Sequence, residues 1–365
     1  MKNRFFTTLF FIIILVCAIF ALLNPYETAF YCSNALKMCT SSLIPSLFIY
    51  MVLSRILSYS SSEGFILSKI TSFISRILGL SEVLVPTCIF GLFCGAPSGA
   101  FAVSRLYSDG LCTKDEAEAA CTLCNNCSAA FILGFAASVT GSTAFSYYIL
   151  ISNILASFTV YMLVFRKTRL DNKKTKTVCR EKSISALITG SIVSSFEAVL
   201  RLCAFVLFFY TASFIISQRL SDILSCFDMP QQAVNAARAI ICSLFEMTSG
   251  IMTAGQVGGL EAVMITAFAV SFTGLSVIFQ VKSVLSKQGL SSKPFIMSRL
   301  LCALLCPIYT LILTYVSVST ATAFAPSKRS GGISGKDLVS LVLITFFTCI
   351  GVFILAHLDK KHKNK

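Results

Sequence analysis

Apolar residues along the chain form runs of membrane-spanning length, separated by short polar stretches. A helix needs about 20 apolar residues to cross a bilayer. Eight runs meet this length: residues 5–23, 36–58, 117–139, 142–165, 186–217, 260–281, 295–317 and 337–357. A shorter run at 64–79 carries Lys69 and Arg76, which favours a helix lying in the membrane interface. The pattern predicts an all-α integral membrane protein with about eight transmembrane helices.

Two further apolar segments, residues 83–108 and 235–256, are broken near their centres by small or polar residues. The first contains Gly95-Ala96-Pro97-Ser98-Gly99, and the second contains Phe245-Glu246-Met247-Thr248-Ser249-Gly250. Each segment forms either one crossing or a re-entrant hairpin of two half-helices. Backbone that leaves the helix at membrane depth is tolerated only where protein or cavity water satisfies its polar groups. The two breaks therefore predict an enclosed polar site.

The distribution of charge favours two re-entrant hairpins. Cytoplasmic loops of membrane proteins are enriched in Lys and Arg. With a cytoplasmic N-terminus and re-entrant hairpins, the basic loop 166–182 and the basic C-terminal tail both lie on the cytoplasmic side. If both segments crossed the membrane, the same loop would lie outside, against its charge. The loop predicted outside at 318–336 carries Lys328 and Arg329 and is the exception to this rule.

With this topology the chain divides into two repeats, residues 35–165 and 186–317. Each contains a helix, a hairpin and two more helices. Each repeat has an odd number of crossings, so the second is inverted relative to the first, as in many secondary transporters. The other segments are an N-terminal helix and loop (1–34), a basic cytoplasmic linker (166–185) and a C-terminal helix with a basic tail (318–365).

Composition agrees with a membrane protein and limits the chemistry. The chain of 365 residues is 56% hydrophobic and 13% charged, about half the charge of a soluble domain. Its net charge of +14 lies mainly in one loop and at the two ends, so it does not indicate nucleic-acid binding. Most of the 16 Cys lie in apolar runs. No metal site, cofactor site or catalytic set is predicted, so we expect the chain not to be an enzyme.

The first hairpin is a candidate binding site for an anion. The N-terminus of a half-helix presents free N–H groups and a partial positive charge. Gly95 and Gly99 would let a ligand approach the backbone closely. Pro97 breaks the helix between them, and Ser98 is expected to cap the second half-helix. The alternative interpretation is a Pro-kinked helix that packs through small residues.

Polar residues within two predicted crossings form a second candidate set. They are Asn125, Asn126, Ser128, Thr273 and Ser276. Amides near mid-membrane are costly unless they are satisfied, and they can donate to a carboxylate or accept from a ligand N–H group. The alternatives are helix–helix hydrogen bonds for the Asn side chains and bonds to their own helix backbone for Ser and Thr.

Charged residues within apolar segments complete the candidates. Glu246, followed by Thr248 and Ser249, is a candidate for a coupling proton or cation, although an ionised carboxylate would repel an anionic substrate. Glu197 and Arg201 are four residues apart and share one helix face, which indicates a self-neutralising pair. Arg201 is kept as an accessory group that could attract an anion.

Several motifs together resemble a known family. They include residues 95–99, Ser108-Asp109-Gly110-Leu111 and Asn125-Asn126 in the first half, and residues 245–250 and Lys293-Pro294-Phe295 in the second. Over about residues 35–317 the chain is similar to the sporulation integral membrane proteins of the YlbJ type. One departure is Cys127, which stands where the family usually has a small or polar residue after the paired Asn.

The resemblance implies a nucleoside-recognition, or gate, domain and a plan similar to that of concentrative nucleoside transporters. It also implies passage of dipicolinic acid from the mother cell across the outer forespore membrane, with both termini and the loop 166–182 on the mother-cell side. The expected partners are this small anion, membrane lipid and a coupling proton or sodium ion, and a homo-oligomer is compatible with the sequence. The alternatives are a transporter of nucleosides or other small metabolites and a non-transporting scaffold of a sporulation membrane complex.

Overall fold

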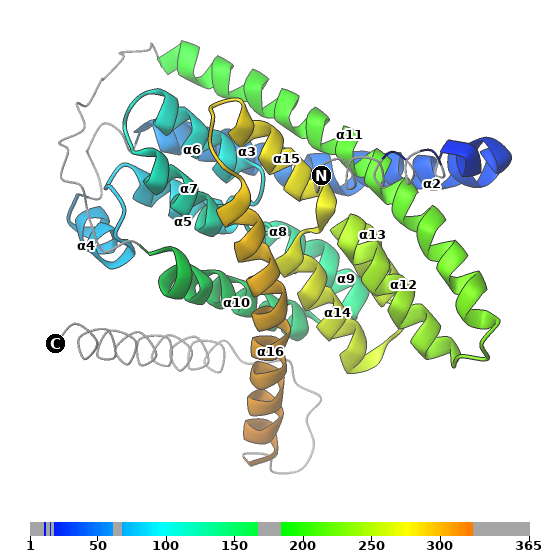
Figure 1. Ribbon diagram of the computed structural model, residues 1–365. Helices are drawn as coiled ribbons and strands as arrows, with labels where there is room; N and C mark the ends of the chain where they lie inside the picture. The colour runs from blue at the N-terminus through cyan, green and yellow to red at the C-terminus, as the bar shows by residue number, and fades with distance from the viewer. Residues whose placement is uncertain (1–10, 12–14, 16–17, 61–67, 167–183, 324–365) are drawn as a thin grey trace, which may run out of the picture.

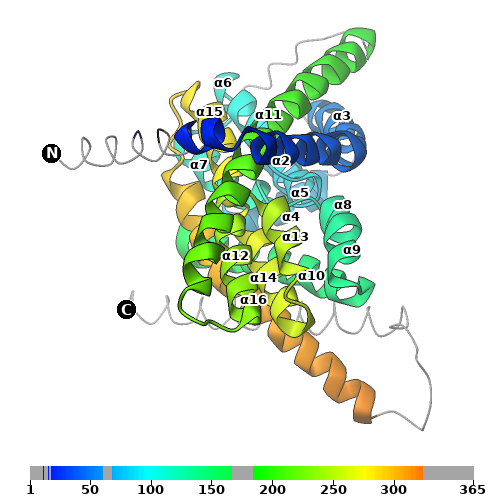
Figure 2. The ribbon, with the colours of Figure 1, turned by 90° about the vertical axis from the view of Figure 1, so that its right-hand side faces the viewer.

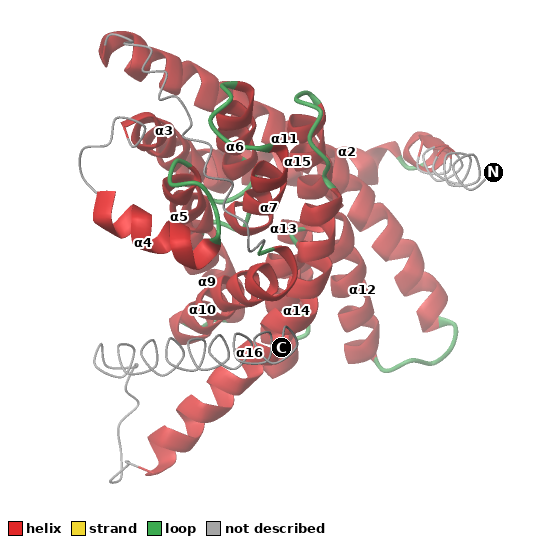
Figure 3. Ribbon diagram, turned by 60° about the vertical axis from the view of Figure 1, so that its left-hand side comes forward, coloured by secondary structure: helices red, strands yellow, loops and turns green. Residues whose placement is uncertain are grey.

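The structure, a computed structural model, describes residues 11, 15, 18–60, 68–166 and 184–323. Every regular element in these residues is a helix (Figure 3), which confirms the all-α class. The first half contains α2 (Pro25–Met38), η1 (Cys39–Leu43), α3 (Ile44–Ser60), α4 (Ser68–Leu78), α5 (Leu84–Cys94), α6 (Ser98–Ser108), α7 (Lys114–Cys124), α8 (Ala129–Phe131), η3 (Ile132–Ala136), α9 (Ala137–Thr140), α10 (Thr143–Val160) and η4 (Tyr161–Phe165). The second half contains α11 (Ile184–Ser225), α12 (Gln231–Phe245), α13 (Met247–Ala254), α14 (Gly259–Phe272), α15 (Gly274–Ser286) and α16 (Lys293–Ala323).

Within these ranges, five helical segments are long and apolar enough to cross a membrane: Lys114–Thr140, Thr143–Phe165, Ile184–Ser225, Gly259–Ser286 and Lys293–Ser317. They coincide with five of the eight predicted crossings, so the chain is an integral membrane protein. The crossing predicted at 36–58 is part of a helix pair, Pro25–Leu43 and Leu47–Leu53, which is bent by 54°. The crossing predicted at 337–357 and most of the one at 5–23 lie outside the described residues.

The first broken segment is a helical hairpin, in which α5 and α6 are joined at residues 95–97. A Cβ atom added at Gly91 would lie 2.2 Å from the carbonyl oxygen of Cys124, and one added at Gly99 would lie 2.1 Å from the same oxygen. These glycines stand four residues before and four residues after Gly95. The two half-helices therefore lie side by side, and both press against the end of α7.

The second broken segment is also a hairpin, formed by α12 and α13, with its turn at Glu246. A Cβ atom added at Gly250 would lie 2.1 Å from Ser243 Oγ and 2.5 Å from Ser243 Cα. The two half-helices are thus in close contact across the turn. Figures 1 and 2 show them next to each other, with α11 packed along α12.

The two halves share one order of elements. In the first, the hairpin α5–α6 is followed by a helix that is broken between α7 and α8, and then by α10. In the second, the hairpin α12–α13 is followed by a helix that is broken between α14 and α15, and then by α16. The predicted interruptions at residues 125–128 and 271–276 are therefore confirmed.

The broken helices lie at the centre of the bundle. In the most apolar window of each segment, 72% of Lys114–Thr140 and 78% of Gly259–Ser286 is buried, against 39% for α11 and 33% for α16. Helix α11 runs along one side of the molecule (Figure 1), and the end of α16 extends beyond the other helices (Figure 2). The exposed side chains of α11 and α16 include Phe208 and Leu304, which suits contact with lipid.

Helix α7 begins with a capping box. Thr113 Oγ1 accepts a hydrogen bond from the backbone N–H of Glu116 at 3.3 Å, and the Glu116 carboxylate accepts one from the Thr113 N–H at 2.9 Å. The same carboxylate accepts a hydrogen bond from the Ser81 N–H at 2.9 Å and so fixes the loop before α5. The cap orients the helix that carries Asn125 and Asn126.

Replacing Thr113 by alanine is expected to lower the free energy of unfolding by about 1 kcal/mol, because the first turn of α7 loses its acceptor. Ser142→Ala is the matched control, since Ser142 is the N-cap residue of α10 but makes no capping hydrogen bond with its side chain. The stability of both variants is measured by thermal unfolding of the purified proteins in detergent. Equal midpoints for the two variants would contradict the role given to this cap.

Candidate functional site

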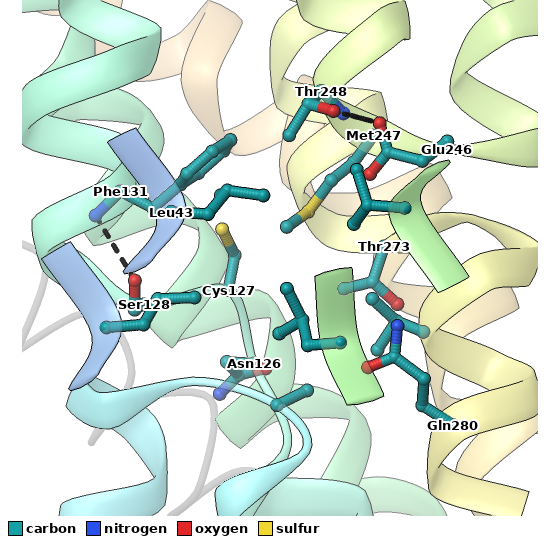
Figure 4. A pocket seen from close by; sticks show the side chains of 15 residues that line it. Leu43, Asn126, Cys127, Ser128, Phe131, Glu246, Met247, Thr248, Thr273 and Gln280 are labelled. Carbon is teal, nitrogen blue, oxygen red and sulfur yellow. Dashed lines mark hydrogen bonds between the residues drawn. The ribbon is translucent and has the colours of Figure 1, made fainter. Parts of the chain in front are cut away.

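The four interruptions of the helices meet at one pocket between the two halves, which we call the central pocket (Figure 4). Residues from the first half and residues from the second half line it from opposite sides. Its polar lining consists of Asn126, Ser128, Glu246, Thr248, Thr273 and Gln280. Leu43, Phe131 and Met247 are among the apolar residues that complete the wall. Five of the predicted site residues therefore share one cavity, although they come from segments more than 100 residues apart.

In the first half, the wall of the central pocket is formed by the turn of the first hairpin, residues 95–97, which packs against the break at residues 125–128 after α7. Gly95 has a φ of +87°, and a Cβ atom there would lie 2.8 Å from the Cβ of Ser128. The Ala96 N–H donates a hydrogen bond of 2.7 Å to the carbonyl oxygen of Asn126. Ser128 Oγ in turn accepts a 3.2 Å hydrogen bond from the Phe131 N–H and caps α8. The hairpin tip thus satisfies backbone that the break exposes.

The second-half wall is built in the same way. Thr273 adopts a left-handed conformation with a φ of 67°, and Gly274 follows with a φ of 76°. A Cβ atom at Gly274 would lie 3.1 Å from Phe245 O and from Glu246 Cα. Here too, a glycine lets the broken helix approach the hairpin tip closely.

Glu246 is a buried carboxylate with neutral hydrogen-bond donors. It is 1% exposed, and its Oε2 accepts hydrogen bonds from Thr248 N (2.8 Å), Ser249 N (2.9 Å) and the Thr248 hydroxyl. It therefore caps α13, where the helix dipole stabilises negative charge. No salt bridge to Glu246 is found in the described part of the chain. A cation that enters the pocket would therefore meet Glu246 without displacing a described cationic side chain.

Ser98 does not cap the second half-helix, so this prediction was wrong. The N-cap residue of α6 is Pro97, and the Ser98 hydroxyl donates to the carbonyl oxygen of Gly95. Instead, Asn125 Oδ1 accepts a 2.8 Å hydrogen bond from the Ala100 N–H. Because residue 97 carries no N–H and Ser98 N bonds to Gly95 O at 3.1 Å, much of this helix terminus is already satisfied by the protein.

Asn125 and Asn126 have different roles. Asn125 does not line the central pocket: its amide joins Ala100 to the carbonyl oxygen of Cys121, to which Nδ2 donates at 2.9 Å. Asn126 does line the pocket, and its Nδ2 donates to Leu123 O at 3.1 Å. Thus Asn125 holds α6 against α7, whereas Asn126 remains a candidate ligand-binding residue.

The other predicted residues lie outside the pocket lining. Gly95, Pro97, Ser98 and Gly99 form the turn behind it and are buried. Ser249 Oγ accepts a hydrogen bond from Ser213 at 2.9 Å, and Ser276 accepts one from Gln280 Nε2 at 3.3 Å. These residues therefore support the pocket rather than face it.

Glu197 and Arg201 form the pair expected from their spacing, with a 3.7 Å contact on α11. Their side chains are 61% and 58% exposed, so they do not belong to the pocket. Among the residues that the structure describes, no group of three or more His, Cys, Asp or Glu could hold a metal ion.

Two polar residues of this region were not predicted as site residues. Gln280 lies one helical turn after Ser276, and its Oε1 has no hydrogen-bond partner in the described part of the chain. Arg299 on α16 is completely buried and donates to Asn126 Oδ1 at 2.6 Å. A charged residue within an apolar run indicates function, so the sequence holds a signal for Arg299. It holds no signal for the contact with Asn126, because the two residues are 173 positions apart.

The central pocket is too small for an organic substrate in this conformation. Its volume is about 30 Å³ on a scale on which one water needs about 10–15 Å³. It therefore has room for about two waters or one small ion. A larger ligand would need one of the hairpins or a wall helix to move.

Over an alignment of 312 positions, the chain is 23% identical to the "Sporulation integral membrane protein YlbJ" of Bacillus subtilis (strain 168). The match covers 77% of this chain and 76% of that protein. The chain is a distant homologue of YlbJ. This homology confirms the family resemblance. No family model and no solved structure matches the chain.

Proposed function

We propose that the chain is a sporulation membrane transporter that carries a small anion, foremost dipicolinic acid, from the mother cell across the outer forespore membrane. The observation that carries this proposal is the meeting of four helix interruptions at one pocket, where six polar side chains lie among apolar ones. Paired broken segments in two halves are typical of substrate sites in secondary transporters. The sporulation setting comes from the name of the homologue.

The mechanism would be alternating access or gated passage. The pocket is small in this conformation, and the hairpin tips that wall it would open toward one side at a time. The shared order of elements supports two repeats. In this proposal the second repeat is inverted, and the distribution of charge in the sequence assigns the termini and the loop 166–182 to the mother-cell side. A substrate would displace the contact between Ala96 and Asn126 or the contact between Glu246 and Gly274 as one wall moves.

Glu246 would bind the coupling ion. A bare carboxylate beside a dicarboxylate is unfavourable, so a proton or sodium ion at Glu246 would make anion binding possible. The hydrogen bonds from Thr248 and Ser249 hold Oε2 in place and leave the rest of the carboxylate for this ion. Anion and cation would then occupy the pocket together.

A nucleoside or other uncharged metabolite is the second candidate. The observation that favours it is the carboxylate of Glu246 in a pocket whose other polar groups are amides and hydroxyls. Such a lining can donate to and accept from a neutral, hydroxyl-rich ligand.

Purified protein in liposomes, offered dipicolinate and nucleosides side by side, tests the proposal. We expect uptake of dipicolinate by the wild-type protein. Asn126→Ala should lower this uptake by about tenfold or more, because a hydrogen bond to a charged group contributes about 1.5–3 kcal/mol and 1.4 kcal/mol is a factor of ten. Asn235→Ala, which removes the same side chain from α12 outside the pocket, should leave it unchanged. Uptake of nucleosides alone would favour the second candidate.

A further inference from the structure

Arg299 is a buried cation at the junction of three helices. It lies on α16, has no exposed surface, and donates from Nη1 to Asn126 Oδ1 at 2.6 Å. Its Nη2 donates to the carbonyl oxygen of Thr122 on α7 at 2.9 Å and to Ser157 Oγ on α10 at 3.5 Å. All three acceptors are neutral oxygens.

The charge of Arg299 has no anionic partner in the residues that the structure describes. No carboxylate forms a salt bridge with it, and its Nε has no hydrogen-bond partner there. The nearest aromatic contact is with Phe295 on its own helix, 5.6 Å from the ring centroid. Burial of a cation without a counter-charge is costly even when hydrogen bonds are made. An anion that reached this guanidinium would remove that cost.

Asn126 connects Arg299 with the central pocket. Its Oδ1 accepts from Arg299 and also from Ser157 Oγ at 2.6 Å, while the residue lines the pocket. Its backbone carbonyl oxygen accepts from the Ala96 N–H at the hairpin tip. One residue therefore separates the cation from the ligand space and also holds the first hairpin.

We propose that Arg299 is the anion-recognition group, and that a ligand carboxylate replaces Asn126 Oδ1 as the acceptor of its guanidinium N–H groups. This inference rests on the proposed function and narrows its substrate class to carboxylate anions. A carboxylate matches the planar guanidinium with two parallel hydrogen bonds, which a single amide oxygen cannot provide. When its side chain is displaced, Asn126 moves together with the break at residues 125–128. Because the Ala96 N–H bonds to the carbonyl oxygen of Asn126, this movement couples ligand binding to the position of the first hairpin.

The test compares uptake of dipicolinate with uptake of its uncharged analogue pyridine-2,6-dicarboxamide in liposomes. The wild-type protein should prefer the dianion. Arg299→Gln should lower the ratio of dianion to diamide uptake by about tenfold or more, because a charge-assisted pair is lost. Arg299→Lys should recover part of the ratio. Arg201→Gln, at an exposed arginine of α11, should leave the ratio unchanged.

A purely structural role of Arg299 would lower both uptakes equally and leave their ratio unchanged. An unchanged ratio in Arg299→Gln therefore overturns the inference, while the proposed function stands. Absence of dicarboxylate uptake by the wild-type protein overturns the proposed function and the inference together.

Asn126→Asp provides a second test that does not depend on the folding of the arginine variants. It places a carboxylate of nearly the same shape at the atom that lies 2.6 Å from Arg299 Nη1. Asn126→Ala loses the same hydrogen bond from Nδ2 to Leu123 O and is the reference. Relative to that variant, the internal anion should raise the thermal unfolding midpoint in detergent, and it should block dipicolinate uptake. A midpoint below that of Asn126→Ala, or uptake at the wild-type rate, contradicts the inference.

Discussion

Replacing Glu246 by alanine is expected to lower dipicolinate uptake by about 100-fold or more, since each hydrogen bond to a charged group is worth about 1.5–3 kcal/mol. The carboxylate accepts hydrogen bonds from the backbone N–H groups of Thr248 and Ser249, and alanine leaves both buried donors without an acceptor. The substitution also removes the only acidic side chain in the described lining of the central pocket. Uptake into liposomes and thermal unfolding in detergent measure the two effects.

Glu246→Gln tests the negative charge of residue 246 separately from its capping of α13. Its amide oxygen can still accept from the N–H groups at the start of α13, so the unfolding midpoint should stay close to that of the wild-type protein. Uptake should still be lost, because the neutral side chain no longer attracts a coupling cation. Glu261→Gln is the matched control, since Glu261 is an exposed carboxylate in the first turn of α14. Wild-type uptake by Glu246→Gln would exclude a role for its charge.

Replacing Gly99 by valine is expected to lower the free energy of unfolding by about 3 kcal/mol or more, at the upper end of the range for overpacked cores. A Cβ atom at this position would lie 2.1 Å from the carbonyl oxygen and 2.8 Å from Sγ of Cys124. The oxygen belongs to the backbone of α7, so it cannot move away without moving that helix. The protein should melt at a much lower temperature and should be depleted from the membrane fraction.

The comparison for Gly99 uses alanine at two positions. Gly99→Ala should already destabilise, because its Cβ alone meets the backbone oxygen of Cys124. Gly190→Ala on α11 should be neutral or slightly stabilising, because no described atom beyond the neighbouring backbone of α11 lies within 4 Å of its added Cβ, and alanine is favoured in helices. Similar melting temperatures for both alanine variants would show that the close approach of α6 to α7 does not limit stability.

The sequence predicted the breaks well because Gly, Pro and Ser stand out within long apolar runs. Both hairpin turns and the breaks near Asn126 and Thr273 lie where those residues interrupt the pattern. The length of α11 was underestimated: it runs to Ser225, beyond the predicted end at 217, because polar residues continue a helix that is no longer apolar.

The direction of side chains at a break could not be predicted. Asn125 and Asn126 are adjacent, but once the chain leaves the helix, the regular rotation between neighbours no longer holds, and only Asn126 reaches the pocket. The link between Asn126 and Arg299 joins α7 to α16, and no local pattern in the sequence encodes such a contact. For the same reason, the cap of α6 came from Asn125 rather than from the neighbouring Ser98.

The contact of Gly91 and Gly99 with Cys124 limits how the molecule can move. The backbones of α5 at Gly91 and of α6 at Gly99 both contact the carbonyl group of Cys124 on α7. Sliding either half-helix along α7 would therefore produce a steric clash. Helices α5, α6 and α7 therefore have to travel as one rigid body. Any opening of the first half must bend at the two ends of this block, where the chain enters α5 at Leu84 and where the break at residues 125–128 meets α8.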